Sequence, residues 1–411
     1  MSSQKDKILQ IEELLIRSID TIYPSKDALK EKLLAGKKLR VYVGIDPTAE
    51  YVHLGHTTNF LILKRFHRLG HKIIILVGDF TALIGDPSDK NAVRKRLTPR
   101  EVKKNLKTYK NQIGKIFNFG DRKNPIEFRF NSRWLSTLSF QDVVDLASNV
   151  TVQQMIERDN FKHRLADKKP LYVHEFLYPL MQGYDSVALD ADVEIGGTDQ
   201  TFNMLVGRTL LKTYKQKEKF VMTTTLLEDS VTGEKLMSKS LGTGIAVNEQ
   251  PNDMFGKIMA LPDRSIIQCF TDCTEVTSSE IREFAEKLTS GTNPREVKLE
   301  LARRIVSMYH GKKFADKAAE NFINIFSNKK FPETIKTYVV QKGERLDSIL
   351  LAQKIIKSKS EWTRLILGGG ISIRFPDEKG EVKITDKYYS MTSPIILQIG
   401  KKIFLKIIPN L

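Results

Sequence analysis

The chain has 411 residues, of which 41% are hydrophobic and 28% charged, and its formal net charge is +17 at pH 7. This length and this balance exclude an intrinsically disordered chain and allow about two or three globular domains. The longest aliphatic run, at 73–77, is too short to cross a bilayer, and no targeting segment is visible at the N-terminus. We therefore expect a cytoplasmic protein that does not span a membrane.

The basic charge is compatible with a solvated surface or with a polyanionic partner, since neutralising phosphates releases counterions. The two cysteines, Cys269 and Cys273, are too few for a structural zinc site or a disulfide framework, and we expect them on one helix face or at a turn and a helix. His67 and His71 have no third ligand nearby, which favours a solvated helix end over a metal site. The sequence therefore predicts no metal held by the protein's own side chains.

Strands and helices alternate over the first half of the chain. We expect a helix at 4–19, a strand at 39–45, a helix at 54–69, a strand at 72–77, a helix near 100–117, a strand near 126–131, helices near 151–159 and 173–184, a strand ending at Glu194 and a helix after Asp199. Strand–helix–strand order predicts a parallel sheet with right-handed crossovers. The expected fold class is α/β, with a doubly wound, Rossmann-like domain at 1–247.

The pattern changes after this domain. Strand signals disappear, and amphipathic segments such as 296–311 predict a small helical domain at 248–330. The lysines and the proline of 327–337 indicate a linker. Residues 341–411 begin with a helical pattern and end with β-type alternation, and they carry roughly twice as many basic as acidic residues. We expect a small, basic α+β domain there.

The segment PTAEYVHLGH at 47–56 falls between a predicted strand and a predicted helix. Free backbone N–H groups and the helix dipole make such a helix start an anion site. Gly55 leaves room for a nucleotide, and His53 and His56 project from one side of the first turn, where they could donate hydrogen bonds to a phosphate. Two polar residues at an exposed helix start would be the alternative interpretation.

A second motif, LMSKS at 236–240, places Lys239 between Ser238 and Ser240. An ammonium group flanked by hydroxyls in a loop can stabilise a pyrophosphate leaving group. Alone it could be any solvated loop, but its pairing with the earlier histidine motif favours nucleotide chemistry.

HLGH together with LMSKS resembles the paired signature of class I aminoacyl-tRNA synthetases. The strings VGIDPTAEYVHLGH, VGDFTALIGDPS, YPLMQGYDS and IGGTDQ, in that order, resemble the bacterial tyrosyl-tRNA synthetases, and the C-terminal string ERLDSILLAQKIIKSKSEWTRLILGGGISI resembles their small RNA-binding domain. The resemblance implies a tyrosine–tRNA ligase that forms tyrosyl-adenylate from L-tyrosine and ATP, releases pyrophosphate and charges tRNA(Tyr). It also implies a homodimer, Mg²⁺ carried by the ATP phosphates, a catalytic domain at 1–247 that includes the MSKS loop, a helical anticodon-side domain at 248–330 and an RNA-binding domain at 341–411.

The family pattern implies a role for each matching residue. Tyr42 and Asp185 would contact the phenolic hydroxyl of tyrosine; Asp86, Tyr178 and Gln182 would hold its ammonium group; and Gln200 would hold its carboxylate. Gly44, Asp46, Gly55 and Asp199 would line the nucleotide site, with Asp199 at the ribose, the position expected for an acid at the end of a strand. Thr48, His53 and His56 would meet the phosphates, and Lys90, Arg94, Ser238 and Lys239 would close over pyrophosphate.

The chain departs from the family pattern at three positions. Leu54 replaces a common isoleucine, a change that conserves volume. Asp89 stands where glycine is common. Leu236 replaces the first lysine of KMSKS, with Lys235 one residue earlier. Three alternatives remain: a tryptophanyl-tRNA synthetase, a small nucleotidyltransferase, and a non-catalytic RNA-binding relative. The Tyr42–Asp185 pair, the chain length and the retained motif residues argue against them.

Overall fold

The computed structural model describes residues 2–88, 97–229, 231–233, 235–237, 243–326, 335–375, 381–400 and 403–410. The chain divides into two compact units, Met1–Ala318 and Ala319–Leu411. In the described part of the chain, we find no helix whose length and apolarity would let it cross a bilayer.

A six-stranded sheet forms the centre of the first unit. Its strands are β1 (Ile19–Tyr23), β2 (Arg40–Ile45), β3 (Lys72–Val77), β4 (Glu127–Phe130), β5 (Val193–Gly197) and β6 (Phe220–Thr224). They lie in the order β1-β6-β5-β2-β3-β4, and all pairs are parallel except the β1–β6 pair at the edge. The runs IIILV of β3 and VEIGG of β5 are fully buried, as expected for strands covered on both faces.

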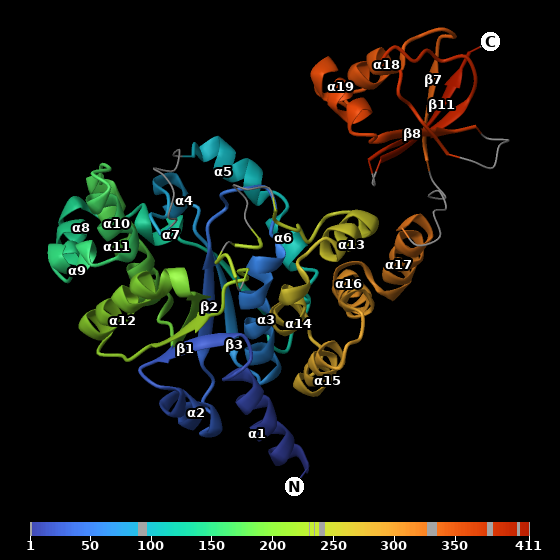
Figure 1. The fold of residues 1–411 in the computed structure, drawn as a ribbon. Helices are drawn as coiled ribbons and strands as arrows, with labels where there is room; N and C mark the ends of the chain where they lie inside the picture. Colours follow the sequence, from blue (N-terminus) through green and yellow to red (C-terminus); the bar gives the residue numbers. More distant parts are fainter. Residues whose placement is uncertain are drawn as a thin grey trace. The chain divides into compact units, whose positions relative to one another are not determined.

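Helices cover both faces of this sheet. They are α1 (Ser2–Leu14), α2 (Lys26–Leu34), α3 (Leu54–Arg68), α4 (Thr81–Ile84), α5 (Pro99–Leu106), α6 (Tyr109–Ile113), α7 (Ser132–Leu135), α8 (Phe140–Ala147), α9 (Val152–Ile156), α10 (Asp159–Ala166), α11 (Val173–Leu189) and α12 (Thr201–Lys215). Helix α3 lies on one side of the central strands, and α11 and α12 lie on the other (Figure 1). The predicted doubly wound α/β fold is confirmed.

Several predicted elements differ in extent. The helix expected near 151–159 is divided into α9 and α10, the helix expected near 173–184 continues to Leu189, and the strand expected to end at Glu194 continues to Gly197. The helix expected at 100–117 is broken between α5 and α6, where the Thr108 hydroxyl donates a hydrogen bond to the Glu50 carbonyl and accepts one from the Gln112 side chain. The helix expected at 4–19 ends at Leu14, and Ser18 adopts a positive φ of 64° before β1. The sequence did not reveal β1, because its apolar residues fit a helical period and only pairing with β6 makes it a strand.

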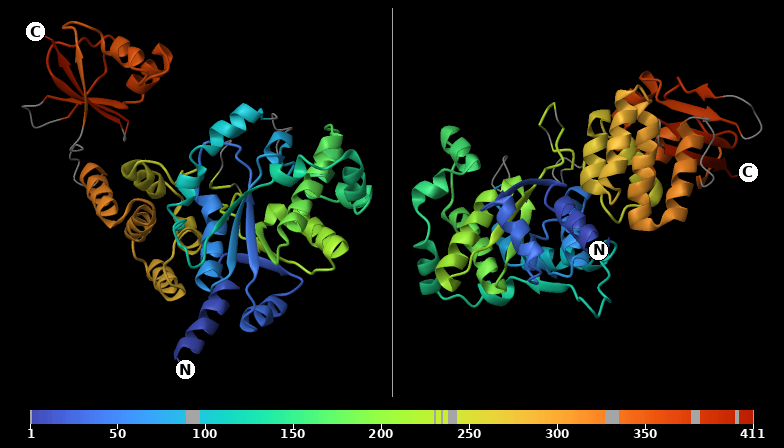
Figure 2. Two further views of the ribbon diagram at one scale, coloured as in Figure 1. Left: turned by 180° about the vertical axis from the view of Figure 1, so that it is seen from behind. Right: turned by 90° about the horizontal axis from the view of Figure 1, so that it is seen from below.

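The rest of the first unit is helical. It contains α13 (Pro251–Met259), α14 (Ile266–Cys273), α15 (Ser278–Thr289), α16 (Pro294–His310) and the start of α17 (Lys312–Phe326). Helices α13, α14 and α15 pack on α16 (Figure 2). Cys269 and Cys273 both lie in α14 and are buried. Of the two predicted arrangements, the structure therefore has the one with both cysteines on one helix.

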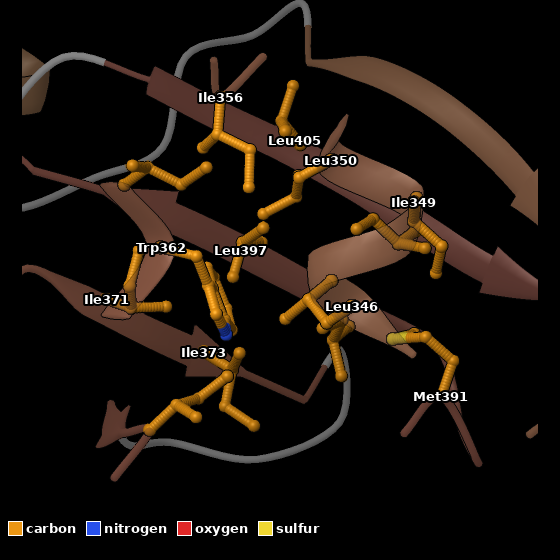
Figure 3. Packing of buried hydrophobic residues seen from close by; sticks show 14 of the residues in the cluster. Leu346, Ile349, Leu350, Ile356, Trp362, Ile371, Ile373, Met391, Leu397 and Leu405 are labelled. Atoms are coloured by element: carbon orange, nitrogen blue, oxygen red, sulfur yellow. The ribbon is translucent and has the colours of Figure 1, made fainter. Parts of the chain in front are cut away.

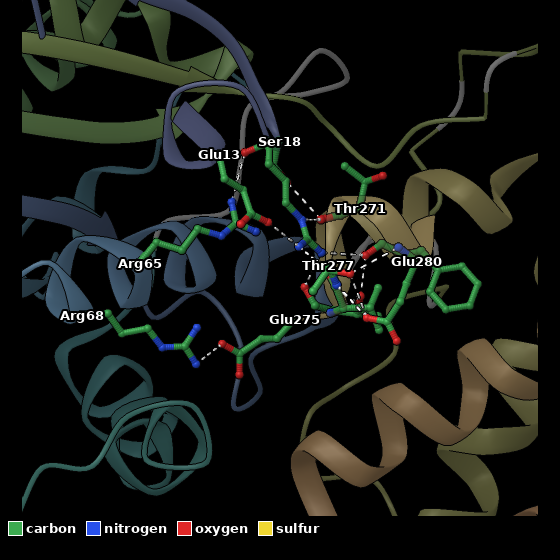
Figure 4. A network of polar contacts seen from close by, with 12 residues as sticks. Glu13, Ser18, Arg65, Arg68, Thr271, Glu275, Thr277 and Glu280 are labelled. Carbon is green, nitrogen blue, oxygen red and sulfur yellow. Dashed lines mark hydrogen bonds and ion pairs between the residues drawn. The ribbon is translucent and has the colours of Figure 1, made fainter. Parts of the chain in front are cut away.

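A polar network joins this helical part to the α/β part. The buried Arg17 guanidinium donates hydrogen bonds to the carbonyls of Phe270, Thr271 and Thr274, at the C-terminal end of α14. Arg68 of α3 pairs with Glu275 across a nitrogen–oxygen distance of 2.6 Å (Figure 4). Carbonyls at a helix C-terminus lack partners within the helix, so a guanidinium there satisfies several at once.

The second unit contains β7 (Lys336–Val340), α18 (Leu346–Ala352), α19 (Lys359–Leu367), β8 (Ile371–Arg374), β9 (Val382–Lys383), β10 (Ile395–Ile399) and β11 (Ile403–Pro409). The strands form one sheet in the order β7-β11-β10-β8-β9. The helices pack on it through a separate core that includes Leu346, Leu350, Trp362 and Leu397 (Figure 3). Most of the linker predicted at 327–337, residues 327–334, lies outside the described residues. Its last two residues and the expected domain start at 341 differ from the structure, because β7 already begins at Lys336. This strand pairs in parallel with β11, a contact that sequence periodicity does not reveal.

His71 also differs from its prediction, since it follows α3 as a buried side chain rather than at a solvated helix end. Its Nδ1 accepts a hydrogen bond of 3.2 Å from the Leu39 backbone N–H. Burial lowers the His71 pKa from 6.5 to about 4.

His71 should make the folded protein sensitive to acid. Because its pKa is lower in the folded state, the unfolded state binds the extra proton, so the stability contribution is complete above pH 6.5 and falls as the pH drops toward about 4. Denaturant unfolding of wild type and His71→Gln at several pH values should show a shallower decline in the variant. His163→Gln, which changes an exposed histidine, serves as the control. Equal slopes for wild type and His71→Gln would contradict this role.

Candidate functional site

A cavity of about 790 Å³ opens at the carboxyl ends of the central strands. Strand β2 lies between β3 and β5, and the chain continues from β2 toward one edge of the sheet and from β5 toward the other. Helices therefore leave these two strands in opposite directions, and the crevice between them is where open α/β sheets bind ligands.

The structure brings most of the sequence-predicted residues to this cavity. Its lining includes Gly44, Asp46, Thr48, His53, Gly55, His56, Asp86, Tyr178, Gln182, Asp185, Asp199 and Gln200. Four predicted residues, Lys90, Arg94, Ser238 and Lys239, lie outside the described residues, as does Asp89. The remaining one, Tyr42, is buried next to the cavity but is not among the residues that line it.

The start of α3 forms one end of the cavity. His53 is the N-cap residue, and its ring lies 3.6 Å from the ring of His56, measured between centroids. The His53 backbone N–H donates to His56 Nδ1 across 3.2 Å, which holds the second imidazole against the first turn. A Cβ atom at Gly55 would lie 3.2 Å from the His53 ring and 3.3 Å from the Met237 Cβ, so this close approach favours glycine.

The described residues on either side of the MSKS serine and lysine reach the same end. Met237 lines the cavity. Beyond the segment, the Leu54 N–H donates to the Ile245 carbonyl across 3.0 Å, and the Val247 N–H donates to the Val52 carbonyl across 2.9 Å. Backbone pairing thus joins the first motif to the segment that follows the second one, far away in the sequence.

Asp199 and Lys235 face each other across the cavity wall. Asp199 follows β5 in a short 3₁₀ turn, and Lys235 Nζ lies 3.4 Å from its Oδ2. Burial raises the Asp199 pKa, and the Lys235 ammonium opposes that shift. Lys235 therefore places a positive charge at the cavity although Leu236 occupies the usual lysine position.

Asp46 directly follows β2, and both of its carboxylate oxygens are engaged. Oδ1 accepts a hydrogen bond of 2.7 Å from the Thr81 hydroxyl, and Oδ2 accepts one of 2.8 Å from the Tyr178 hydroxyl. A Cβ atom at Gly78 would lie 1.9 Å from Asp46 Oδ1, so only glycine fits beside this carboxylate. The result is a fixed acceptor at the centre of the cavity.

Polar side chains next to Asp46 form a second group. Asp86 Oδ2 accepts a hydrogen bond of 2.7 Å from Gln200 Nε2, while its Oδ1 accepts the Ser88 N–H in an Asx turn. Asn203 donates to the side-chain oxygens of Gln182 and Gln200 across 3.0 Å and 3.1 Å. Asp86 thus has a turn-forming role and a place on the cavity wall at the same time.

Asp185 of α11 is buried at the far wall. Its Oδ1 accepts a hydrogen bond of 2.7 Å from Trp134 Nε1, and its Oδ2 accepts one of 3.2 Å from Asn131 Nδ2. Burial raises the Asp185 pKa well above its usual range, and these two hydrogen bonds act in the opposite direction. Each oxygen keeps a further lone pair, so the carboxylate can accept one more hydrogen bond from a bound hydroxyl.

Several residues of the site were missed by sequence reasoning, among them Gly78, Thr81, Asn131, Trp134, Ser186, Glu194 and Lys219. Glu194 lines the cavity, and it could have been predicted from the sequence, because it is a charged residue inside an otherwise apolar buried strand. Asn131 and Trp134 gave no such signal, because their role depends on meeting Asp185 in space.

Comparison with known proteins agrees with this geometry. Residues 34–327 match the family model for class I tRNA synthetases (W and Y). The chain is 43% identical to the tyrosine–tRNA ligase of Carboxydothermus hydrogenoformans, covering 98% of each chain, and 42% identical to that of Mannheimia succiniciproducens, covering 96% of this chain and 97% of the relative.

Solved structures show the same fold. A C-terminally truncated mitochondrial tyrosyl-tRNA synthetase of Coccidioides posadasii has a TM-score of 0.62 at 24% identity and covers 78% of this chain and 96% of its own. The Archaeoglobus fulgidus tyrosyl-tRNA synthetase, solved with L-tyrosine, has a TM-score of 0.59 at 22% identity and covers 76% and 99%. The family model and the full-length relatives together establish that this chain belongs to the class I tRNA synthetases of the tryptophan and tyrosine type.

Proposed function

We propose that the protein is a tyrosine–tRNA ligase. It activates L-tyrosine with ATP, releases pyrophosphate and transfers tyrosine from the adenylate to the 3′ end of tRNA(Tyr). The observation that carries this proposal is Asp185, a buried carboxylate held by Trp134 and Asn131 on the wall of a cavity that also contains the α3 anion site. A phenolic hydroxyl is a hydrogen-bond donor that this carboxylate can accept.

In the first step, the tyrosine carboxylate attacks the α-phosphorus of ATP in line and pyrophosphate leaves. The protein supplies positioning and electrostatic stabilisation, and no side chain acts as a nucleophile. Mg²⁺ is bound by the ATP phosphates and offsets their charge. The N–H groups at the start of α3 and the imidazoles of His53 and His56 face the phosphates.

The two ends of the amino acid are held by different groups. Asp185 accepts a hydrogen bond from the phenolic hydroxyl, and Tyr42 also contacts that hydroxyl. Asp86, Tyr178 and Gln182 bind the ammonium group, and Gln200 binds the carboxylate. The support is that these cavity residues are held in two hydrogen-bonded groups. Asp86, Gln200 and Gln182 are joined through Asn203. Tyr178 and Asp185 are joined through Asp46, Thr81 and Asn131.

The nucleotide lies toward the strand ends. Gly44 is exposed there, and its Cα has no neighbour where a side chain would begin, which leaves space for a base or a sugar. Asp199 binds the ribose hydroxyls and Thr48 a phosphate. Lys90, Arg94, Ser238 and Lys239 close over the pyrophosphate, an assignment that rests on the sequence motifs. Lys235, which pairs with Asp199, supplies a positive charge near the nucleotide.

In the second step, the terminal adenosine hydroxyl of tRNA attacks the tyrosyl-adenylate. The basic second unit binds the tRNA. Lys354, Lys357, Lys359 and Arg364 are exposed around α18 and α19, where they can neutralise phosphates. The helices of 248–330 lie on the anticodon side, and the enzyme acts in the cytoplasm.

The active form is a homodimer. Large apolar side chains are exposed on neighbouring elements of the first unit: Phe140 and Val144 on α8, Val152 on α9, and Val173 at the start of α11. Phe140 is 85% exposed and Val173 is 80% exposed. Exposed apolar side chains grouped in this way are typical of a protein interface, which supports assembly of two copies through this region.

Pyrophosphate exchange tests the proposed function. The purified protein is incubated with ATP, Mg²⁺, labelled pyrophosphate and each amino acid in turn. Label should enter ATP only with tyrosine, because its phenolic hydroxyl donates a hydrogen bond to Asp185, whereas phenylalanine has no donor at that position. Exchange with tryptophan in place of tyrosine, or no exchange with any amino acid, would refute the proposal.

A further inference from the structure

A buried polar cluster lies behind the cavity wall, between α11, α12, β2 and β5. It consists of Tyr42, Ser186, Glu194 and Lys219, none more than 2% exposed. Lys219 Nζ donates to Ser186 Oγ across 2.7 Å and forms an ion pair with Glu194. Tyr42 Oη lies 2.8 Å from the same Ser186 Oγ. Only Glu194 of this cluster lines the cavity.

Helix α12 has a glycine, Gly207, where it packs against this cluster. A Cβ atom at Gly207 would lie 2.7 Å from both Lys219 Nζ and Ser186 Oγ, so glycine leaves the space that the ammonium group occupies. Burying an ammonium group and a carboxylate together is costly, and such a pair adds little stability over apolar residues of similar size. The arrangement therefore calls for a reason beyond stability.

Counting protons shows what the ammonium group does. Lys219 can only donate, so its bond to Ser186 occupies one acceptor position of that hydroxyl. The single Ser186 proton then points either to Tyr42 Oη at 2.8 Å or to Glu194 Oε2 at 3.3 Å. Donation from a cation polarises the serine O–H and makes it a better donor to the nearer Tyr42 oxygen.

When Ser186 donates to Tyr42, the phenolic proton of Tyr42 points away from Ser186. Burial, together with Glu194 and Asp185, raises the Tyr42 pKa well above 10.0, so this proton is retained. The charge of Asp185 acts on Tyr42 directly. Tyr42 then keeps a proton to donate, and the two carboxyl groups that act on it, Glu194 and Asp185, both line the cavity.

We propose that Lys219 and Ser186 are positioning residues for amino-acid selection, which set the direction of the Tyr42 hydroxyl from outside the cavity. Glu194 links this pair of residues to the cavity. Its Oε2 forms the ion pair that neutralises Lys219, and its Oε1 accepts a hydrogen bond of 3.1 Å from Gln182. This inference rests on the proposed function, since it presupposes that the cavity binds tyrosine.

The test measures kcat/KM for tyrosine and for phenylalanine in pyrophosphate exchange. Ser186→Ala should lower the tyrosine-to-phenylalanine ratio by about 3- to 10-fold, the effect of one neutral hydrogen bond. Tyr42→Phe should lower it by a similar factor. The double variant should be no worse than Tyr42→Phe alone, because Ser186 acts through the hydroxyl that Tyr42→Phe removes. Ser265→Ala, a buried serine remote from the cavity, is the matched control and should keep the wild-type ratio.

A combined variant tests the ion pair of Lys219 and Glu194. Lys219→Met combined with Glu194→Gln leaves no unpaired buried charge, and comparison with wild type reports the contribution of the ion pair. The combined variant should show a ratio about 3- to 10-fold lower than wild type.

The outcomes are distinct. An unchanged ratio in Ser186→Ala, a further loss when Ser186→Ala is added to Tyr42→Phe, or a wild-type ratio in the combined Lys219→Met and Glu194→Gln variant would each overturn the positioning role. Absence of tyrosine-dependent exchange in wild type would instead overturn the proposed function.

Discussion

Asp185→Asn should lower the preference for tyrosine over phenylalanine by about 10²-fold, the upper range for one hydrogen bond to a charged group. The loss should fall on kcat/KM for tyrosine, while kcat/KM for phenylalanine changes little. A pocket that is merely apolar cannot separate two amino acids that differ by one hydroxyl, whereas a buried acceptor left without its partner penalises phenylalanine strongly.

The existing partners of Asp185 make this replacement severe. Trp134 Nε1 and Asn131 Nδ2 both donate to it, one to each oxygen. An asparagine would turn its own NH₂ group toward one of these donors, so the amide could accept only on its remaining oxygen. Tyr42→Phe, which removes a hydroxyl that is not on the cavity lining, should have the smaller effect.

The control is Asp347→Asn, which alters a buried carboxylate of the second unit that pairs with Arg345. It should leave the exchange kinetics unchanged. Thermal melting of each variant separates loss of folding from loss of recognition. If Asp185→Asn keeps the wild-type ratio of kcat/KM, Asp185 does not bind the hydroxyl, and the proposed tyrosine specificity loses its main physical support.

Ending the chain after Phe326 should leave tyrosine-dependent pyrophosphate exchange within about two-fold of wild type but reduce tRNA charging by about 10²-fold or more at physiological salt, since several phosphate contacts are lost at once. The cut keeps Ala319–Phe326, the first residues of the second unit, and removes α18, α19 and the sheet that contains β7. A cut within 336–340 would leave part of β7 unpaired. The described residues that line the cavity belong to the first unit, and the second unit has its own hydrophobic core.

A milder variant checks the electrostatic part of this expectation. Lys357→Gln, Lys359→Gln and Arg364→Gln change three exposed basic side chains together. The dependence of log K for tRNA on log salt should become shallower by about 2 to 3, since each lost phosphate contact removes just under one unit of slope. Normal tRNA charging by the truncated protein at physiological salt would show that the second unit is not needed for tRNA.

The ends of β2 and β3 and both motifs could be identified from local patterns. Val41 to Ile45 and Ile73 to Val77 are apolar runs; Asp46 directly follows the first, and Asp86 follows the second after helix α4. A parallel sheet brings such strand ends together whatever the details of packing. For this reason, all the predicted site residues that the structure describes, apart from Tyr42, line one cavity.

Periodicity fails where a residue's state depends on a distant partner. β1 and β7 are strands because β6 and β11 supply their hydrogen bonds, and His71 is buried because the Leu39 N–H meets its ring. The local sequence of these segments is equally compatible with a helix, a linker or a solvated end.

The polar contacts of the site likewise depend on residues that are distant in the sequence and meet only in the folded protein. The side chains that hold Asp185 and Tyr42 come from segments 51 to 144 residues away along the chain. A hydrogen bond requires two atoms within about 3 Å in a suitable direction, and no pattern in the sequence encodes that placement for a single pair. The sequence alone thus reveals the fold class, the nucleotide motifs and the family, while the packing of α11 and α12 on the sheet determines which groups line the cavity and which act on it from behind.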